Sequence, residues 1–135
     1  MRLLVLLVSL FLVGACSHTD SDAAKVFENA FSMQAPPSDV VALHGYGLER
    51  RKFFITSKRM WRLHLGGPGA KKFVRQRWPD LQLGSPRVFL QGSQTPWFAP
   101  GRNVQYSTFI SAADPAITVM ESEDSDEVFV AYDGL

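Results

Sequence analysis

The sequence predicts an α+β fold: a small, mostly antiparallel sheet with an N-terminal helix and a second short helix. Two segments carry apolar residues at three- and four-residue spacings, as amphipathic helices do. Most other apolar segments alternate apolar and polar residues, as strands with one buried face do. These strand-like segments follow one another in runs, which favours antiparallel pairing.

The first helix is predicted over Asp22–Gln34, where one apolar stripe includes Val26, Phe27 and Phe31. The two prolines that follow Ala35 end it. Its polar face mixes acidic and basic side chains, whereas helices that lie on membranes favour a basic face. We therefore expect this helix to pack against its own domain, with the membrane surface as the alternative.

A second helix is predicted over Ala70–Trp78 and ends at Pro79. In the strand predicted before it, Arg62 and His64 should face away from the apolar side. The last two strands should form a hairpin around the acidic loop ESEDSDE. The predicted strands are Val40–Gly45, Lys52–Thr56, Met60–Leu65, Arg87–Gln91, Asn103–Ser111, Ala116–Met120 and Glu127–Tyr132.

The start of the chain differs from the rest. Leu3 to Val13 is an apolar run that only Ser9 interrupts, and the positively charged Arg2 precedes it. A transmembrane helix needs about 20 apolar residues. The run is therefore too short to span a bilayer and has the length of the hydrophobic region of a signal peptide. A buried N-terminal helix is the alternative.

The residues Val13-Gly14-Ala15-Cys16 resemble the lipobox of bacterial lipoproteins, in which leucine is more usual than valine at the first position. The resemblance implies that the thiol of Cys16 receives a diacylglyceryl group and that the chain is cut before this residue. It also implies that a fatty acid such as palmitate acylates the new amine. The implied organisation is a cleaved signal peptide (1–15), a lipidated tether (16–21) and a single globular α+β domain (22–135).

The same resemblance implies a location in the cell envelope. Aspartate after the lipidated cysteine is typical of retention in the inner membrane, and this chain has Ser17 there. We therefore expect the outer membrane, facing the periplasm, with the plasma membrane of a Gram-positive host as the alternative. Export excludes nucleic acid as a partner, and a single cysteine forms no disulfide within the chain.

The sequence carries no recognisable motif for catalysis or for a cofactor. The three histidines, His18, His44 and His64, lack the spacing of a zinc site, and Ser57 and Ser85 have no base signature nearby. We therefore predict no catalytic residue, no metal and no cofactor. A histidine beside a carboxylate in a pocket would favour the alternative, a hydrolase acting on envelope polymers.

The segment TPWFAPGR places Trp97 and Phe98 between two prolines. Aromatic residues on a stiff loop are typical of recognition surfaces, so we predict both as interaction residues. The alternative is that both rings cover an open end of the core. The segment also resembles parts of small bacterial lipoproteins and secreted domains, which implies no activity.

Charge is unevenly distributed along the chain. Between Arg50 and Arg77 there are ten basic residues and no acidic one, and after Arg102 there are seven acidic residues and no basic one. A basic segment favours contact with anionic headgroups. The alternative is pairing with the acidic C-terminal segment. The candidate interaction residues here are Arg50, Arg51, Lys71, Lys72 and Arg75.

Together these features predict a lipid-anchored envelope protein without enzymatic activity, whose role is binding or structural. Its partners would be the membrane, through the anchor, and either an anionic envelope surface or another protein. The alternative is an immunity or exclusion lipoprotein that neutralises a toxin or a phage factor at the envelope.

Overall fold

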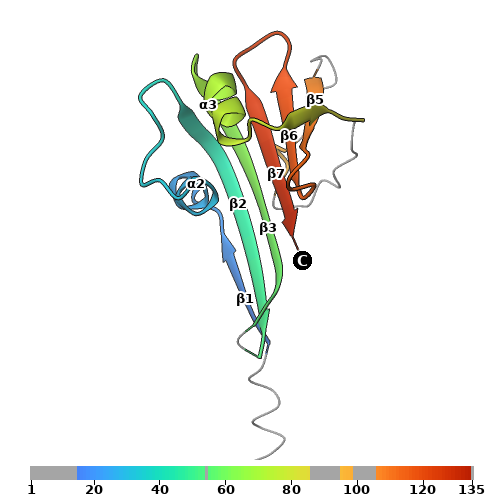
Figure 1. The fold of residues 1–135 in the computed structure, drawn as a ribbon. Helices are drawn as coiled ribbons and strands as arrows, with labels where there is room; N and C mark the ends of the chain where they lie inside the picture. The colour runs from blue at the N-terminus through green and yellow to red at the C-terminus, as the bar shows by residue number, and fades with distance from the viewer. Residues whose placement is uncertain (1–14, 54, 86–94, 99–105, 135) are drawn as a thin grey trace, which may run out of the picture.

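The computed structural model describes residues 15–53, 55–85, 95–98 and 106–134, which build one antiparallel sheet with two helices (Figure 1). Seven strands lie side by side in the order β1-β2-β3-β7-β6-β5-β4. The strands are β1 (Ala15–Asp20), β2 (Val41–Lys52), β3 (Ile55–Gly66), β4 (Leu81–Leu83), β5 (Tyr106–Ser111), β6 (Ile117–Ser122) and β7 (Val128–Gly134), and the helices are α2 (Ala23–Phe31) and α3 (Ala70–Arg77).

The predicted α+β fold is wrong, because the described chain is mainly one large β-sheet with helices of nine and eight residues. The sheet is not small, since β2 and β3 each run for twelve residues. The first helix is also not the N-terminal element, because β1 precedes it and pairs with β2. The physical reason is that pairing with β3 continues β2 through residues 50–52. These residues are all basic, so apolar alternation does not mark them as a strand.

Both helices lie where the sequence predicts them, but each is shorter than predicted. α2 begins after Asp22, whose side chain accepts a hydrogen bond from the backbone N–H of Ala24 at 3.0 Å. It ends at Ser32, which has a left-handed backbone with φ of 54°. The predicted C-terminal hairpin is confirmed as the β6–β7 pair. The predicted strand Arg87–Gln91 lies outside the described residues.

Both helices add side chains to one core on the same face of the sheet. α2 contributes Val26, Phe27 and Phe31 and packs on β2 and β3, and α3 contributes Ala70 and Val74. The prediction that the first helix packs against its own domain is therefore confirmed. The buried strand residues of this core are Trp61, Leu63 and Leu65 of β3, Ile117 and Val119 of β6, and Val128 and Val130 of β7.

A glycine in β2 allows α2 to approach the sheet closely. A β-carbon at Gly45 would lie 2.9 Å from the Cα of Ala23 and 3.0 Å from the Cβ of Val26, which is closer than real side chains pack. A β-carbon at Gly47 would lie 3.7 Å from its nearest neighbour, which is ordinary van der Waals contact. The missing side chain at Gly45 therefore sets the distance between α2 and β2.

The opposite face of the sheet carries a second, smaller core. Phe98 is only 3% exposed and packs with Met120, Phe129 and Ala131. The rings of Phe98 and Phe129 meet edge to face, with centroids 5.7 Å apart. Because both faces are covered here, every residue of β6 is buried.

We expect Gly45→Ala to lower the free energy of unfolding by about 1–3 kcal/mol, the usual cost of forcing an extra group into a packed interface. Gly47→Ala is the matched control and should change this free energy little, because its new methyl group has room. Urea titration measures both variants. Equal losses in the two variants would contradict a close contact specific to Gly45.

Candidate functional site: the hairpin tip beside Cys16

At one end of the sheet the hairpin of β2 and β3 extends beyond β7, while β1 accompanies β2 as far as Lys52 (Figure 1). β7 pairs with β3 only from Arg59 onward, so residues 55–58 contact no second strand within the described ranges. Along the other side of the hairpin, β1 places the exposed Cys16 opposite Arg51. We call residues 50–53 and 55–59 the hairpin tip.

The hairpin tip carries five exposed basic side chains. The one acidic residue in the sequence from 49 to 59 is Glu49. Arg51 donates a hydrogen bond from Nε to Glu49 at 2.8 Å, and Nη2 of Arg59 lies 3.8 Å from the same carboxylate. The hydrogen bond from Arg51 holds the pKa of Glu49 below its ordinary value, so Glu49 is ionised at neutral pH and offsets one of the five charges. The basic residues are Arg50, Arg51, Lys52, Lys58 and Arg59.

Two apolar side chains are exposed between these basic residues. Phe53 is 56% exposed and Ile55 is 71% exposed. Phe53 has a left-handed backbone with φ of 53°, and Nζ of Lys52 lies 5.8 Å from the centre of its ring. Sequence reasoning missed these two residues, although basic residues on both sides of an apolar pair were a visible signal. The tip therefore combines apolar and positively charged surface.

The other basic residues predicted as interaction residues lie on α3, away from the hairpin tip (Figure 1). Arg75 donates hydrogen bonds from Nε and Nη2 to Glu121 of β6 at 2.8 and 2.7 Å, and its guanidinium lies 5.0 Å from the ring centre of Phe109. The hydrogen bonds to Glu121 raise the pKa of Arg75. Glu121 is 6% exposed, so Arg75 compensates a buried charge and fits the alternative of internal pairing. Lys71 and Lys72 lie on the same helix.

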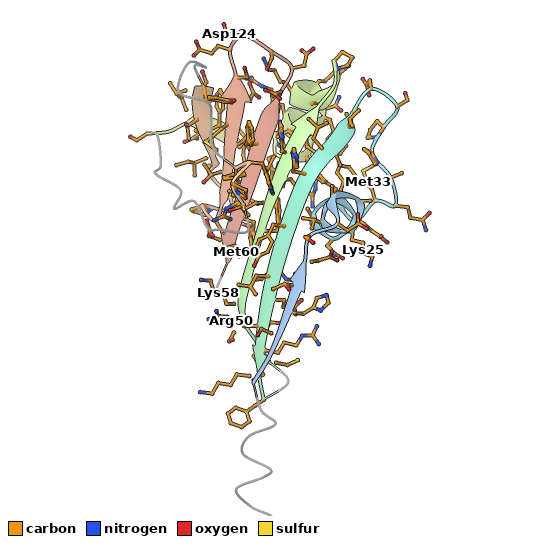
Figure 2. All side chains as sticks on the ribbon, turned by 180° about the vertical axis from the view of Figure 1, so that it is seen from behind. Lys25, Met33, Arg50, Lys58, Met60 and Asp124 are labelled. Atoms are coloured by element: carbon orange, nitrogen blue, oxygen red, sulfur yellow. The ribbon has the colours of Figure 1, made fainter. Side chains whose placement is uncertain are left out.

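Acidic residues gather at the end of the molecule opposite the hairpin tip. Figure 2 shows Asp124, in the loop between β6 and β7, at one end and Arg50 and Lys58 near the other. Between the two ends, Arg62 of β3 donates two hydrogen bonds from Nη2 to Asp133 of β7, at 2.8 and 3.0 Å. The fold therefore divides the basic segment of the sequence, and only part of it lies beside Cys16.

The aromatic segment packs onto the sheet. Phe98 is buried in the second core, as described above, and Trp97 is half-buried. The ring of Trp97 stacks on His44 with centroids 5.2 Å apart and meets Phe98 edge to face at 5.7 Å. This arrangement fits the alternative in which both rings cover the core, and it leaves part of Trp97 accessible.

A polar network that the sequence did not reveal lies beneath Trp97. Nδ1 of His44 and Nδ1 of His64 are 3.1 Å apart, and Nε2 of His64 lies 3.1 Å from Oε1 of Glu127. With Glu127 ionised and His64 neutral, His64 donates from Nε2 to Glu127 and accepts at Nδ1 from His44. Both histidines fall in predicted strands, but the β2–β3 register that pairs them is a property of the fold.

The network is a partly buried contact between strands, in which His64 is buried while His44 and the side chain of Glu127 are exposed. His64 is 8% exposed and stacks on Phe129 with ring centroids 4.2 Å apart. Burial lowers the pKa of His64 below its ordinary value, and the nearby carboxylate of Glu127 opposes this effect. Burial therefore favours the neutral form of His64. In the part of the chain that the structure describes, no group of three or more His, Cys, Asp or Glu side chains is arranged to hold a metal ion.

A small groove lies beside the hairpin, between β1, α2, β2 and β3. Its volume is about 180 Å³, and its polar lining includes His18, Asp20, Asn29, Glu49 and Arg59. It shares Glu49 and Arg59 with the surroundings of the hairpin tip, so the groove and the tip belong to the same end of the molecule.

No family model matches the chain, and neither the curated proteins nor the solved structures contain a match. Among the residues that the structure describes, no helix has both the length and the apolar content needed to cross a membrane. Functional interpretation therefore depends on the sequence motif at Cys16 and on the geometry around it.

We expect the free energy of unfolding to fall as the pH is lowered below about 6.5, because the unfolded chain then binds a proton that His64 in the folded protein resists. His64→Gln should reduce this dependence. His18→Gln, at an exposed position of β1, is the control and should leave it unchanged. Urea titrations across this pH range measure the slope. Identical slopes in the wild type and His64→Gln would contradict the assignment.

Proposed function

We propose that the protein is a lipid-anchored protein of the bacterial cell envelope, with a binding or structural role and without enzymatic activity. The observation that carries the proposal is the position of Cys16. It is exposed at the start of the edge strand β1, and it ends the lipobox-like sequence. An acyl group there would leave the folded core undisturbed.

Acyl chains on Cys16 would hold the protein stably. Each methylene group buried in a bilayer contributes about 0.8 kcal/mol, and one chain alone binds only reversibly. A diacylglyceryl group together with an acylated amine would supply enough chains for lasting attachment. By the same resemblance, the proposed location is the outer membrane, with the domain in the periplasm.

The pairing of β1 with β2 supports a fixed orientation of the anchored domain. Residues 16–20 do not form a loose tether, because they lie in register with residues 47–51 of β2. The anchor would therefore hold the hairpin-tip end near the bilayer and the acidic loop between β6 and β7 away from it (Figure 2). A binding role would then fall to surfaces that face the periplasm.

We expect Cys16→Ser to abolish incorporation of labelled palmitate and to leave the precursor uncut, because serine lacks the thiol that forms the thioether. Metabolic labelling, followed by gel electrophoresis of the envelope fraction, measures both results. The control is Ser57→Ala, which removes an exposed hydroxyl of β3 outside the lipobox-like sequence and should be labelled and processed normally. Palmitate in the Cys16→Ser protein would overturn the proposal.

Ser17→Asp tests the location. By resemblance to lipoproteins that carry aspartate after the cysteine, this variant should move from the outer to the inner membrane while keeping its palmitate label. Ser17→Thr, which adds no charge, is the matched control and should stay in the outer membrane. Separation of the two membranes by density measures the distribution. An unchanged distribution in Ser17→Asp would contradict the outer-membrane assignment.

A further inference from the structure

We propose that the hairpin tip inserts into the headgroup region of an anionic lipid bilayer, as a second membrane contact beside the acyl chains. This inference rests on the proposed lipid anchor at Cys16. The partner of the tip is the bilayer itself. The contacting residues are the apolar pair Phe53 and Ile55 and the surrounding basic side chains.

The apolar part of the tip fits the boundary between headgroups and acyl chains. Phe53 and Ile55 sit at the turn of a hairpin that projects past β7, while β1 accompanies β2 as far as Lys52, so both exposed side chains lie at the extremity of the sheet. Exposed apolar side chains grouped at one extremity fit a contact surface. Burial of these side chains in lipid removes apolar surface from water.

The charged part of the tip selects an anionic surface. Four net positive charges remain on residues 49–59 after Glu49 offsets one of the five basic residues. Basic side chains within about 8 Å of an anionic bilayer are attracted to it at physiological salt. An apolar centre with a basic margin is the pattern of surfaces that lie in the membrane interface.

The position of the anchor makes the two contacts compatible. Cys16 lies opposite Arg51 in the β1–β2 register, at the same end of the sheet as Phe53 and Ile55. Because β1 is a strand of the sheet, acyl chains at Cys16 bring the tip to the bilayer without reorganisation of the domain. The anchor therefore gives the tip a high effective concentration at the membrane, so a weak contact is enough.

A single thiol probe tests the inference in the full lipid-anchored protein. Ile55→Cys, labelled with an environment-sensitive nitrobenzoxadiazole fluorophore, is reconstituted into vesicles that contain phosphatidylglycerol. We expect blue-shifted emission, quenching by doxyl-labelled lipid and protection from aqueous acrylamide. Asp124→Cys, in the acidic loop at the opposite end, is the matched control and should show the emission of a probe in water.

Neutral substitutions test the role of charge. In the Ile55→Cys background, Arg50→Gln with Lys58→Gln should lower the ratio of inserted to withdrawn tip roughly 30-fold, from the usual attraction of two basic residues to an anionic surface. Lys71→Gln with Lys72→Gln removes the same charge from α3 and should change this ratio little. Vesicles of phosphatidylcholine alone should weaken insertion in the parent and abolish the difference between the two pairs.

The outcomes separate this inference from the proposed function. Lipidated wild-type protein should not react with a thiol reagent, because Cys16 is its single cysteine and its sulfur is then part of a thioether. If palmitate is present and the probe at residue 55 stays in water on anionic vesicles, the tip inference fails while the anchor stands. If palmitate is absent, the anchor proposal fails. The tip is then decided separately on anionic vesicles by comparing Cys16→Ser protein carrying the probe with the same protein carrying Arg50→Gln and Lys58→Gln, since both keep the apolar residues 3–13. Protection of the probe without quenching by lipid overturns the inference in favour of contact between copies of the chain, the one protein in the vesicles.

Discussion

The register of β2 against β3 determines the rest of this structure. It sets Gly45 opposite Leu63, on the face that α2 covers, and His44 opposite His64 on the other face. A slip of one residue would turn every side chain of a strand to the wrong face, so both cores depend on this pairing. The register also brings the basic residues before and after the turn together at one end of the molecule.

The fold converts a nearly neutral composition into separated charge. The chain has fourteen basic and thirteen acidic residues, and loss of Arg2 with a signal peptide would make these numbers equal. Arg62 and Arg75 pair with carboxylates of β7 and β6, which joins the two halves of the sheet. The basic residues of the hairpin tip share only Glu49 among the pairs described, so the positive field concentrates there.

The local elements could be predicted from the sequence because each has a local cause. Helix α2 follows from its apolar spacing and from Asp22, and the β6–β7 hairpin follows from apolar segments around an acidic turn. The sheet as a whole could not be predicted in this way. β1 is polar and exposed, and the three residues of β4 are too few to show a period, so only pairing with β2 and β5 defines them as strands.

The candidate site could be predicted only in part, because some of its contacts depend on the fold. The lipobox-like motif and the basic residues are visible in sequence order, whereas the division of those residues between the hairpin tip and α3 is a property of the fold. The contact between His64 and Glu127 joins residues 63 positions apart, and no spacing rule connects them. Arg75 was predicted as an interaction residue because its partner, Glu121, lies 46 positions away on β6 and cannot be recognised in the sequence.

The strand character of β1 bears on the order of events during maturation. If the chain is cut before Cys16, the scissile bond joins the first two residues of β1, and both are paired with β2 in the folded protein. A protease needs an extended segment that no other strand already occupies. Edge strand β1 would therefore join the sheet only after this bond has been cut. Until then β2 would present an open edge, which is the usual place for unwanted association between chains.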